Sequence, residues 1–458
     1  MTSAGQARSD EGDPDLRRRT IRWIVGLALV GLIFDGYDLV VYGTLVPIFL
    51  RDASHIGPVD PTLAGALGSY ALVGVLVGAL MAGSVADIVG RRKVMLTAYA
   101  WFSVGMIATA FTASAGAFGV LRFVTGLGVG ALVATTGALV AEFAPPGRKN
   151  LCNAITYSGV PLGSLLAALL AILLLPVIGW RGMLLIGGLP LVTLLPLALL
   201  KMPESPAWLM SRGRVEEAER TERRCGIPLA EITARPTDST TSDQEADGRP
   251  GFGGLFRHYL TPTILLGLMS AVGLLLVYAL NTWLPELMGR AGFSTSGSLG
   301  FLLVLNGGAV LGALFASRLA DRFGPKRVVA GSFAVGAVAI VLMTIDLPLG
   351  ALMALVAIVG LGTSGTQILI YGFVATYYRT SVRSAGVAWC AGFGRLGGVG
   401  GPLVGGLMVA SGLALDSIFY VLAALAVVGG LLTWVVPATH RPSVRRPATR
   451  DSAPAAGN

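Results

Sequence analysis

Asp35 and Asp38 interrupt an apolar run that is long enough to cross a membrane. A charge near the bilayer centre costs roughly 2.5–3.5 kcal/mol on insertion scales, so two charges three residues apart indicate a functional use. At a rise of 1.5 Å per residue, Asp35 lies roughly 20 Å from the start of the helix, near mid-membrane, on the same helix face as Asp38. Neighbouring carboxylates in a dry site cannot both ionise cheaply, which predicts that the pair binds and releases protons as a coupled unit. The alternative is a structural role, with each Asp bonded to a neighbouring helix or to an Arg.

Two arginines, Arg122 and Arg395, also fall inside apolar runs. An Arg in a membrane interior needs a partner. Either it pairs with Asp35, Asp38 or Glu142, or its planar fork of donors binds the carboxylate of a substrate. The two arrangements can alternate, because a substrate carboxylate can replace an internal carboxylate that has taken up a proton. For Arg122 the pairing role is favoured, whereas for Arg395 the two roles remain equal alternatives.

The composition indicates an integral membrane protein. Hydrophobic residues make up 54% of the chain and charged residues only 13%, and the mean hydropathy is +0.73. This leaves too little polar surface to cover a soluble globule. Twelve apolar runs of about 20 residues are predicted to span the membrane: residues 22–50, 62–85, 94–112, 117–141, 151–177, 182–201, 260–288, 297–317, 327–345, 349–374, 385–410 and 416–436.

The basic residues predict how these spans are oriented. With twelve spans, one side of the membrane receives the Lys and Arg of residues 17–19, 91–93, 148–149, 318–327, 379 and 383, together with those of the central loop and the C-terminal tail. Only Arg51, Arg181 and Arg290 fall on the other side. Because cytoplasmic loops are enriched in Lys and Arg, both termini are predicted to be cytoplasmic. The net charge of +9 therefore needs no nucleic-acid partner to explain it.

A polar linker divides the chain into two halves that repeat each other. The expected organisation is an N-terminal tail (1–21), a first half (22–202), the linker (203–258), a second half (259–437) and a C-terminal tail (438–458). Within the linker, residues 215–219 predict a short surface helix and residues 235–251 predict disorder. The loop SVADIVGRRKV after the second span and the loop RLADRFGPKRV after the eighth agree at the Ala-Asp, Gly and basic positions.

Such a repeat, and the Gly-x-x-x-Asp-x-x-Gly-Arg-Arg pattern that begins at Gly83, resemble the major facilitator superfamily. The resemblance implies an all-α membrane fold of twelve helices, arranged as two six-helix pseudo-repeats with a binding site at the midplane between them. One departure is Ile88, which stands where the family usually has Arg, although the second copy has Arg322.

In that superfamily, the Asp and the basic residues of these loops pair across helix ends and close one gate. The resemblance therefore implies gating roles for Asp87, Arg91, Arg92, Glu142, Asp321, Arg322 and Arg383. The alternatives are that the charges set the topology and solvate a tight turn, and that Glu142 forms a surface salt bridge with Arg148 or Lys149.

Within the superfamily, the stretch Asp35-Gly-Tyr-Asp38, followed by Val-Tyr42-Gly and by Gly-Arg395-Leu-Gly in the eleventh span, is similar to the aromatic acid:proton symporters. This resemblance implies that Tyr42 and Trp283 are available to stack on the ring of the substrate, and that Asn281 and Gln367 are available to bind a ring hydroxyl. The alternative roles are apolar anchoring for the aromatic residues and hydrogen bonding between helices for the amides.

We therefore expect a symporter of the inner or plasma membrane that imports a small aromatic carboxylate, such as a hydroxybenzoate, with protons by alternating access. A symporter of a non-aromatic acid, similar to a muconate or a sialate, and a membrane receptor for the same acid are the alternatives. The three histidines lack metal-ligand spacing, and the chain has no Gly-x-x-x-x-Gly-Lys-Ser/Thr loop for phosphate. We expect no metal, no cofactor other than protons as the coupling ion, no ATP or nucleic-acid partner and no enzymatic activity.

Overall fold

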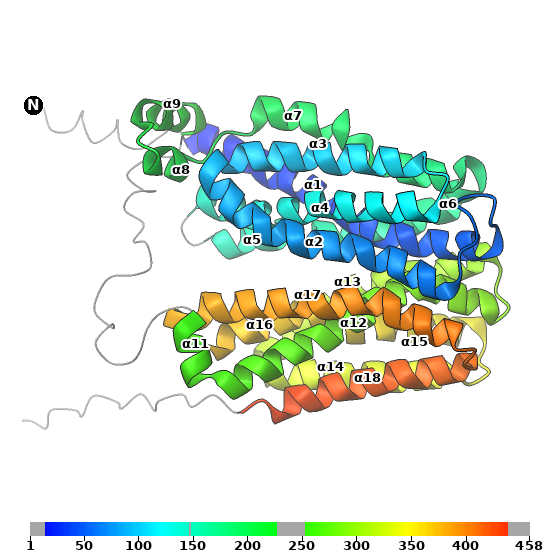
Figure 1. The fold of residues 1–458 in the computed structure, drawn as a ribbon. Helices are drawn as coiled ribbons and strands as arrows, with labels where there is room; N and C mark the ends of the chain where they lie inside the picture. The colour runs from blue at the N-terminus through cyan, green and yellow to red at the C-terminus, as the bar shows by residue number, and fades with distance from the viewer. Residues whose placement is uncertain (1–13, 146–147, 227–251, 438–458) are drawn as a thin grey trace, which may run out of the picture.

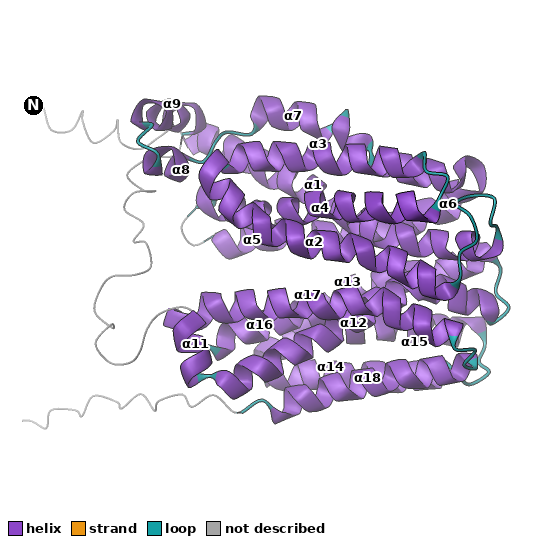
Figure 2. Cartoon of the chain, in the orientation of Figure 1, coloured by secondary structure: helices purple, strands orange, loops and turns teal. Residues whose placement is uncertain are grey.

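The computed structural model describes residues 14–145, 148–226 and 252–437. Within these ranges the secondary structure is helical and contains no strand (Figure 2). Eleven helical segments of the described chain are long and apolar enough to cross a membrane, and the shorter apolar stretch Leu189–Lys201 is compatible with a twelfth span. The prediction of an all-α membrane fold is confirmed. The disorder predicted for residues 235–251 falls on residues outside these ranges.

The first half consists of α1 (Pro14–Arg51), α2 (Pro61–Val89), α3 (Arg91–Ala110), α4 (Ala115–Phe143), α5 (Lys149–Tyr157), α6 (Gly159–Gly187), the 3-10 turn η1 (Leu189–Leu191) and α7 (Leu194–Lys201). The linker contains α8 (Pro206–Ser211), α9 (Val215–Cys225), which includes the predicted surface helix, and α11 (Phe252–His258). The second half consists of α12 (Leu260–Arg290), α13 (Thr295–Phe323), α14 (Pro325–Leu342), α15 (Leu349–Gly360), the π-turn η2 (Leu361–Gly365), α16 (Thr366–Tyr377), α17 (Thr380–Ala410) and α18 (Leu415–Val435).

Local sequence sets where several of these helices begin. Asp60 before α2, Ser114 before α4 and Ser294 before α13 each accept a hydrogen bond from the backbone N–H three residues later. This contact satisfies one of the N–H groups that the first turn of a helix leaves without a partner. The short polar segments between apolar runs thus define the helix starts.

Three predicted spans are interrupted, and α1 is longer than predicted. The span 151–177 breaks at Ser158, between α5 and α6, and the span 182–201 comprises the end of α6, η1 and α7. Gly179, which falls between these two predicted spans, adopts φ 64° and ψ −177° and forms a kink inside α6. A positive φ is accessible to Gly because it lacks a Cβ. The tenth span contains η2, a π-turn of the kind that often marks functional sites. Helix α1 begins at Pro14 rather than near residue 22, with Asp15 in its first turn.

The two halves form separate helical bundles that lie side by side (Figure 1). Helices α8, α9 and α11 lie at one end of both bundles, which we call the linker end, and the opposite end is the far end (Figure 1). Apolar side chains are exposed on the surface of the helices, for example Leu173 and Val177 on α6 and Trp434 on α18. Such an apolar exterior fits a protein surrounded by lipid.

The halves contact each other at the far end. Ser69 Oγ on α2 donates a hydrogen bond of 2.7 Å to the Val399 carbonyl on α17. Arg51 Nη2, at the end of α1, lies 3.8 Å from Glu286 Oε2 on α12. Gly43 lies so close to the Asn281 backbone that a Cβ added there would overlap it.

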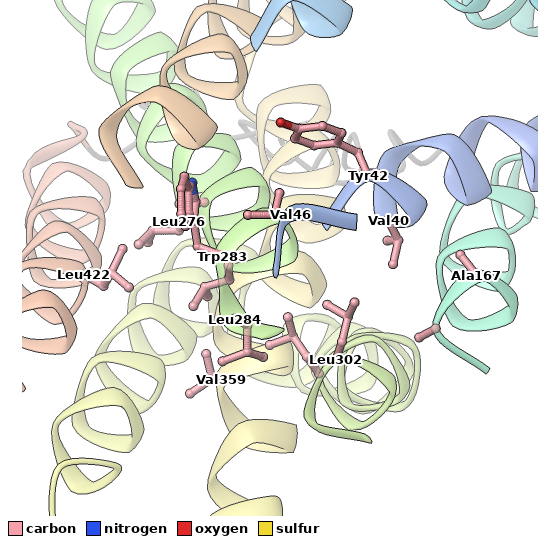
Figure 3. Close-up of a cluster of buried hydrophobic side chains, with 14 of the residues drawn as sticks. Val40, Tyr42, Val46, Ala167, Leu276, Trp283, Leu284, Leu302, Val359 and Leu422 are labelled. Atoms are coloured by element: carbon pink, nitrogen blue, oxygen red, sulfur yellow. The ribbon is translucent and has the colours of Figure 1, made fainter. Parts of the chain in front are cut away.

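A common cluster of buried apolar side chains surrounds these contacts (Figure 3). It includes Val40, Val46 and Ala167 from the first half and Leu276, Leu284 and Leu302 from the second. In the described chain, no hydrogen bond or ion pair joins the halves at the linker end. The structure is therefore closed at the far end.

Candidate functional site

Asp35 and Arg395 lie at the same depth on two helices from opposite halves. Asp35 is 16 residues before the end of α1 at Arg51, or about 24 Å at 1.5 Å per residue. Arg395 is 15 residues before the end of α17 at Ala410, or about 22 Å. The two side chains interact electrostatically, and both are partly exposed. The middle of the protein thus holds a carboxylate and a guanidinium on opposite halves that influence each other electrostatically, although no ion pair or hydrogen bond joins them in the described chain.

Asp38 has different surroundings from Asp35. Arg122 on α4 forms an ion pair with it, and the two side chains are only 3–5% exposed. The guanidinium carbon of Arg122 also lies 5.4 Å from the centre of the Tyr42 ring, at cation–π distance. The pairing role of Arg122 is therefore the one that this conformation shows. A buried pair of this kind holds α1 against α4 and leaves Asp35 as the more accessible carboxylate.

Three tyrosines surround the Asp35 and Arg395 pair. Tyr157 at the end of α5 and Tyr278 on α12 interact electrostatically with both charges, and Tyr371 on α16 interacts with Arg395. Tyr157 is 40% exposed. The site thus combines one carboxylate, one guanidinium and several aromatic rings, the groups that a small aromatic acid needs for its charge and its ring.

Gln367 brings an amide to the same region. Its Nε2 donates a hydrogen bond of 3.0 Å to Ser270 Oγ on α12, and the residue directly follows the π-turn and Thr366. The Thr366 hydroxyl donates to the Leu361 carbonyl across that turn, at 3.0 Å. The π-turn changes the rotation of α16 relative to α15, and this places Gln367 and Tyr371 on the inner face.

Three other predicted substrate contacts serve helix packing in this conformation. The Tyr42 hydroxyl donates to the Ala64 carbonyl on α2, and Trp283 Nε1 donates to the Pro402 carbonyl on α17 at 2.8 Å. Asn306 Nδ2 on α13 donates to Asn281 Oδ1 at 2.9 Å. All three side chains are at most 2% exposed, so none of them is open to a ligand here.

The first copy of the repeated loop is held by an ion pair and by four hydrogen bonds. Arg91 at the start of α3 forms an ion pair with Glu142 at the end of α4. The backbone N–H of Arg92 donates to Glu204 Oε1 at 2.9 Å, and its side chain donates to the Leu199 carbonyl at 2.7 Å. The Asp87 carbonyl accepts bonds from two linker side chains, those of Trp208 (2.8 Å) and Arg212 (2.9 Å).

The second copy has fewer contacts. Asp321, Arg322 and Arg383 are exposed, and in the described part of the chain none of them forms an ion pair. Lys326 instead donates to the Val436 carbonyl at the end of α18, at 2.5 Å. Among the described residues, the predicted gating residues of the first half therefore form an ion pair and hydrogen bonds, those of the second half form no ion pair, and no ion pair joins the two loops.

Sequence reasoning missed Tyr157 and Ser270 as members of the central site. Tyr157 is the last residue of α5, directly before the break at Ser158 and Gly159. The Tyr-Ser-Gly stretch ahead of Pro161 is the signal that marks this break. Nothing in the surrounding sequence distinguishes Ser270 from the other hydroxyl residues of the spans.

Comparison with known proteins adds independent information. The family described as "Sugar (and other) transporter" matches residues 24–444. The chain is 32% identical to a benzoate transport protein of Acinetobacter baylyi, over 92% of this chain and 91% of that protein. It is 33% identical to a gentisate transporter of Corynebacterium glutamicum, over 90% and 86% of the two chains. It is 32% identical to the 4-hydroxybenzoate transporter PcaK of Pseudomonas putida, over 91% and 93%.

Solved structures show the same architecture. The inward open conformation of the xylose transporter XylE from Escherichia coli superimposes with a TM-score of 0.72 at 18% identity, covering 92% of this chain and 98% of that one. At this identity the likeness concerns the fold. Together with the family match over most of the chain and the paired bundles described above, it shows that the protein belongs to the sugar (and other) transporter family of the major facilitator superfamily.

Proposed function

We propose that the protein is a symporter that imports a small aromatic carboxylate, such as a hydroxybenzoate, together with protons. The observation that carries this proposal is the placement of Asp35 and Arg395 at one depth on opposite halves, with tyrosines around them. Relatives named for benzoate, gentisate and 4-hydroxybenzoate transport support the choice of substrate class. Protons are the only coupling partner that the proposal requires.

The mechanism uses the exchange of one carboxylate for another. While Asp35 is charged, it neutralises Arg395 between the halves. A proton that binds Asp35 removes this attraction, so the guanidinium is free to bind the carboxylate of the substrate. The ring of the substrate then packs against Tyr157, Tyr278 or Tyr371. Protonation and substrate binding are coupled because each makes the other more favourable.

Alternating access follows from where the halves touch. In the conformation described, the far end is closed by the contacts of Ser69 and Arg51. We propose that the linker end is cytoplasmic, as the distribution of Lys and Arg predicts, and that this conformation therefore opens inward. Rocking of the halves about the central site would separate the far-end contacts and bring the two repeated loops together.

The decisive test is uptake of radiolabelled 4-hydroxybenzoate into proteoliposomes, with and without an inward proton gradient. We expect accumulation to require the gradient and to be lost in Asp35→Asn, while exchange of internal for external label continues in that variant. Asp346→Asn, which alters an exposed loop carboxylate, is the matched control and should transport normally. Gradient-driven accumulation in Asp35→Asn would overturn the assignment of the coupling site.

Competition experiments separate the substrate classes. Excess unlabelled benzoate or gentisate should inhibit uptake, whereas cis,cis-muconate should not. Inhibition by muconate alone would favour a symporter of non-aromatic acids, and saturable binding without any transport would favour a receptor. Arg395→Lys keeps the charge but removes the bidentate fork, so it should raise KM for the aromatic acid more than it lowers the maximal rate.

A further inference from the structure

A groove runs along the outside of the first half, between the beginning of α1 and α7. It has a volume of about 510 Å³, within the range of about 300–1,000 Å³ that small-molecule sites occupy. Its walls are largely apolar and its mouth is basic. The residues that line it are Arg19, Arg22, Trp23, Gly26, Leu27, Val30, Thr193, Leu194 and Leu197. Because α7 lies at the outer edge of the bundle, this groove opens toward lipid rather than toward the central site (Figure 1).

A second hollow continues the groove toward the linker end. It measures about 150 Å³ and shares Arg19 and Trp23 with the larger groove. Lys201 and Arg224 also line it, and the Lys201 ammonium lies 5.7 Å from the centre of the Trp23 ring. The two hollows together thus form one elongated site with an apolar part and a polar part.

All the charged side chains that line this elongated site are positive. Four cationic side chains line it, those of Arg19, Arg22, Lys201 and Arg224, and no carboxylate does. In the described part of the chain, none of these four forms an ion pair. By contrast, Arg220 and Arg223 on α9 lie within 4.0 Å of the carboxylates of Glu216 and Glu219. The positive charge of the site is therefore not neutralised by the protein around it.

Gly26 shows that the apolar part is open. A Cβ added at Gly26 would meet no atom within 4 Å, although α1 is closely packed on its other side, where a Cβ at Gly36 would overlap the Val160 carbonyl. A larger side chain at residue 26 would therefore occupy the groove without disturbing the packing of α1. This makes Gly26 a direct means of filling the site.

The depth of the groove matches that of a lipid in one leaflet. Trp23 is 12 residues before Asp35, or about 18 Å along α1. Since the hydrocarbon core is about 30 Å thick, a residue about 18 Å from the midplane lies at the level of the headgroups. Arg19 and Lys201 then lie among the headgroups, and Gly26 and Val30 lie among the acyl chains.

We propose that this groove binds an anionic phospholipid, with its phosphate among Arg19, Lys201 and Arg224 and one acyl chain along Gly26 and Val30. The assignment of the leaflet rests on the proposed cytoplasmic position of the linker end, whereas the choice of ligand does not. A third groove on the surface, about 290 Å³ between α14 and α15, is lined only by apolar residues. That groove offers lipid chains a surface but no charge, so, unlike the site on α1, it has no means of selecting an anionic headgroup.

The test is retention of dioleoylphosphatidylglycerol or dioleoylphosphatidylcholine by the purified full chain, measured by native mass spectrometry from detergent. We expect phosphatidylglycerol to bind more tightly, and its affinity to fall about fivefold for each cation removed in Arg19→Gln, Lys201→Gln and Arg224→Gln. Gly26→Leu should weaken binding with the four cations intact. Soluble glycerol phosphate, which offers the same charge without a chain, should not displace the lipid.

Matched variants keep the test specific. Arg220→Gln and Arg223→Gln remove equal charge from α9 outside the groove, and Gly331→Leu fills open space on α14, so all three should retain the lipid. Equal retention of the two lipids by the unaltered chain, or equal losses in the groove variants and the matched variants, would overturn the proposal. Because binding is measured without transport, a negative result here would leave the proposed symport activity untouched.

Discussion

The two halves of the molecule arose from one sequence pattern, yet they hold their polar groups in different ways. The first half contains a buried ion pair, Arg122 with Asp38, and a second pair, Arg91 with Glu142, at the linker end. The second half uses amides inside, as in Asn281 with Asn306, and leaves Asp321 exposed at the linker end. The first half thus has a buried ion pair near mid-membrane where the second half has an amide pair, and the ion pair of the second half, Glu286 with Arg290, lies at the far end of α12.

This difference indicates which half changes on proton binding. A proton alters an ion pair strongly, but it leaves an amide–amide bond unchanged. The two carboxylates near the middle of the membrane, Asp35 and Asp38, both belong to α1, whereas the buried Glu286 of the second half lies near the end of α12, beside Arg290 and Arg51. The second half contributes Arg395 and neutral side chains to the central site. We therefore expect proton coupling to reside in the first half, and the second half to contribute mainly to substrate binding.

The largest effect should follow from Arg122→Gln, which would leave Asp38 buried without a counter-charge. Removing one partner of a buried pair typically costs about 3–5 kcal/mol, so we expect a large fall in the midpoint of thermal unfolding in detergent and loss of transport. The double variant Arg122→Gln with Asp38→Asn should recover most of the thermal stability. No recovery in the double variant would show that the pair is not the source of the loss.

A smaller effect is expected from Glu204→Gln, which weakens the contact between the linker and the first loop. Glu204 Oε1 accepts from the backbone N–H of Arg92, and a hydrogen bond to a charged group contributes about 1.5–3 kcal/mol. Gln keeps an oxygen acceptor, so the change replaces a charged hydrogen bond by a neutral one, and the linker should detach about five times more often. The second loop, which has no such linker contact in the described chain, should be unaffected.

Cys225 on α9 reports this detachment. Burial raises the pKa of its thiol to about 11, so little thiolate is present at neutral pH and alkylation by N-ethylmaleimide should be slow. Detachment in Glu204→Gln should expose the thiol, lower its pKa toward the usual range and speed labelling. Glu219→Gln, on the exposed face of the same helix, is the control. Equal labelling rates in both variants would contradict a holding role for Glu204.

A still smaller effect is expected from Asn306→Leu in the second half. The change removes the hydrogen bond to Asn281, and such bonds between membrane helices average about 0.6 kcal/mol. We expect a modest decrease in the unfolding midpoint and an unchanged requirement for the proton gradient in the uptake assay. A decrease in the unfolding midpoint as large as that of Arg122→Gln would show that the amide pair of the second half is as important for stability as the ion pair of the first half.

The smallest effect is expected from Arg322→Gln in the second loop. Its guanidinium is exposed and stacks on Phe323, and exposed charges usually contribute less than about 0.5 kcal/mol. Stability should not change measurably. The uptake rate should fall only if the two loops meet in the outward-facing state, so an altered rate at constant stability would sharpen the gating role predicted for this residue.

Much of the fold follows from local features of the sequence. Three such features are the apolar runs, the distribution of Lys and Arg, and capping residues such as Asp60 and Ser114. Each depends only on residues that are close together in the sequence, so each can be recognised without the structure. The break at η1, inside the predicted span 182–201, was not predicted, because Gly and Pro are frequent inside membrane helices. Whether they end such a helix depends on the neighbouring helices, which can satisfy the freed backbone groups.

The candidate site was predictable only in part. The sequence identified Asp35, Asp38, Arg122 and Arg395, because charges inside apolar runs stand out. It did not identify Tyr157, because an aromatic residue near the end of a predicted span is usually an interfacial anchor. It also assigned Tyr42 and Trp283 to the substrate. In this conformation both side chains are buried, and each donates a hydrogen bond to the backbone of a neighbouring helix.

The sequence by itself determined that this is a membrane protein with two repeated halves, and it determined the depth of each charge in the membrane. Hydropathy and the helical rise per residue depend only on the order of residues along the chain. Only the tertiary structure decided that Arg122 pairs with Asp38, that Arg91 pairs with Glu142, and that Arg395 acts electrostatically on Asp35. These interactions depend on the rotation and order of helices that are far apart in the chain. Electrostatic attraction in a medium of low dielectric then makes each pairing a strong determinant of which helices lie together.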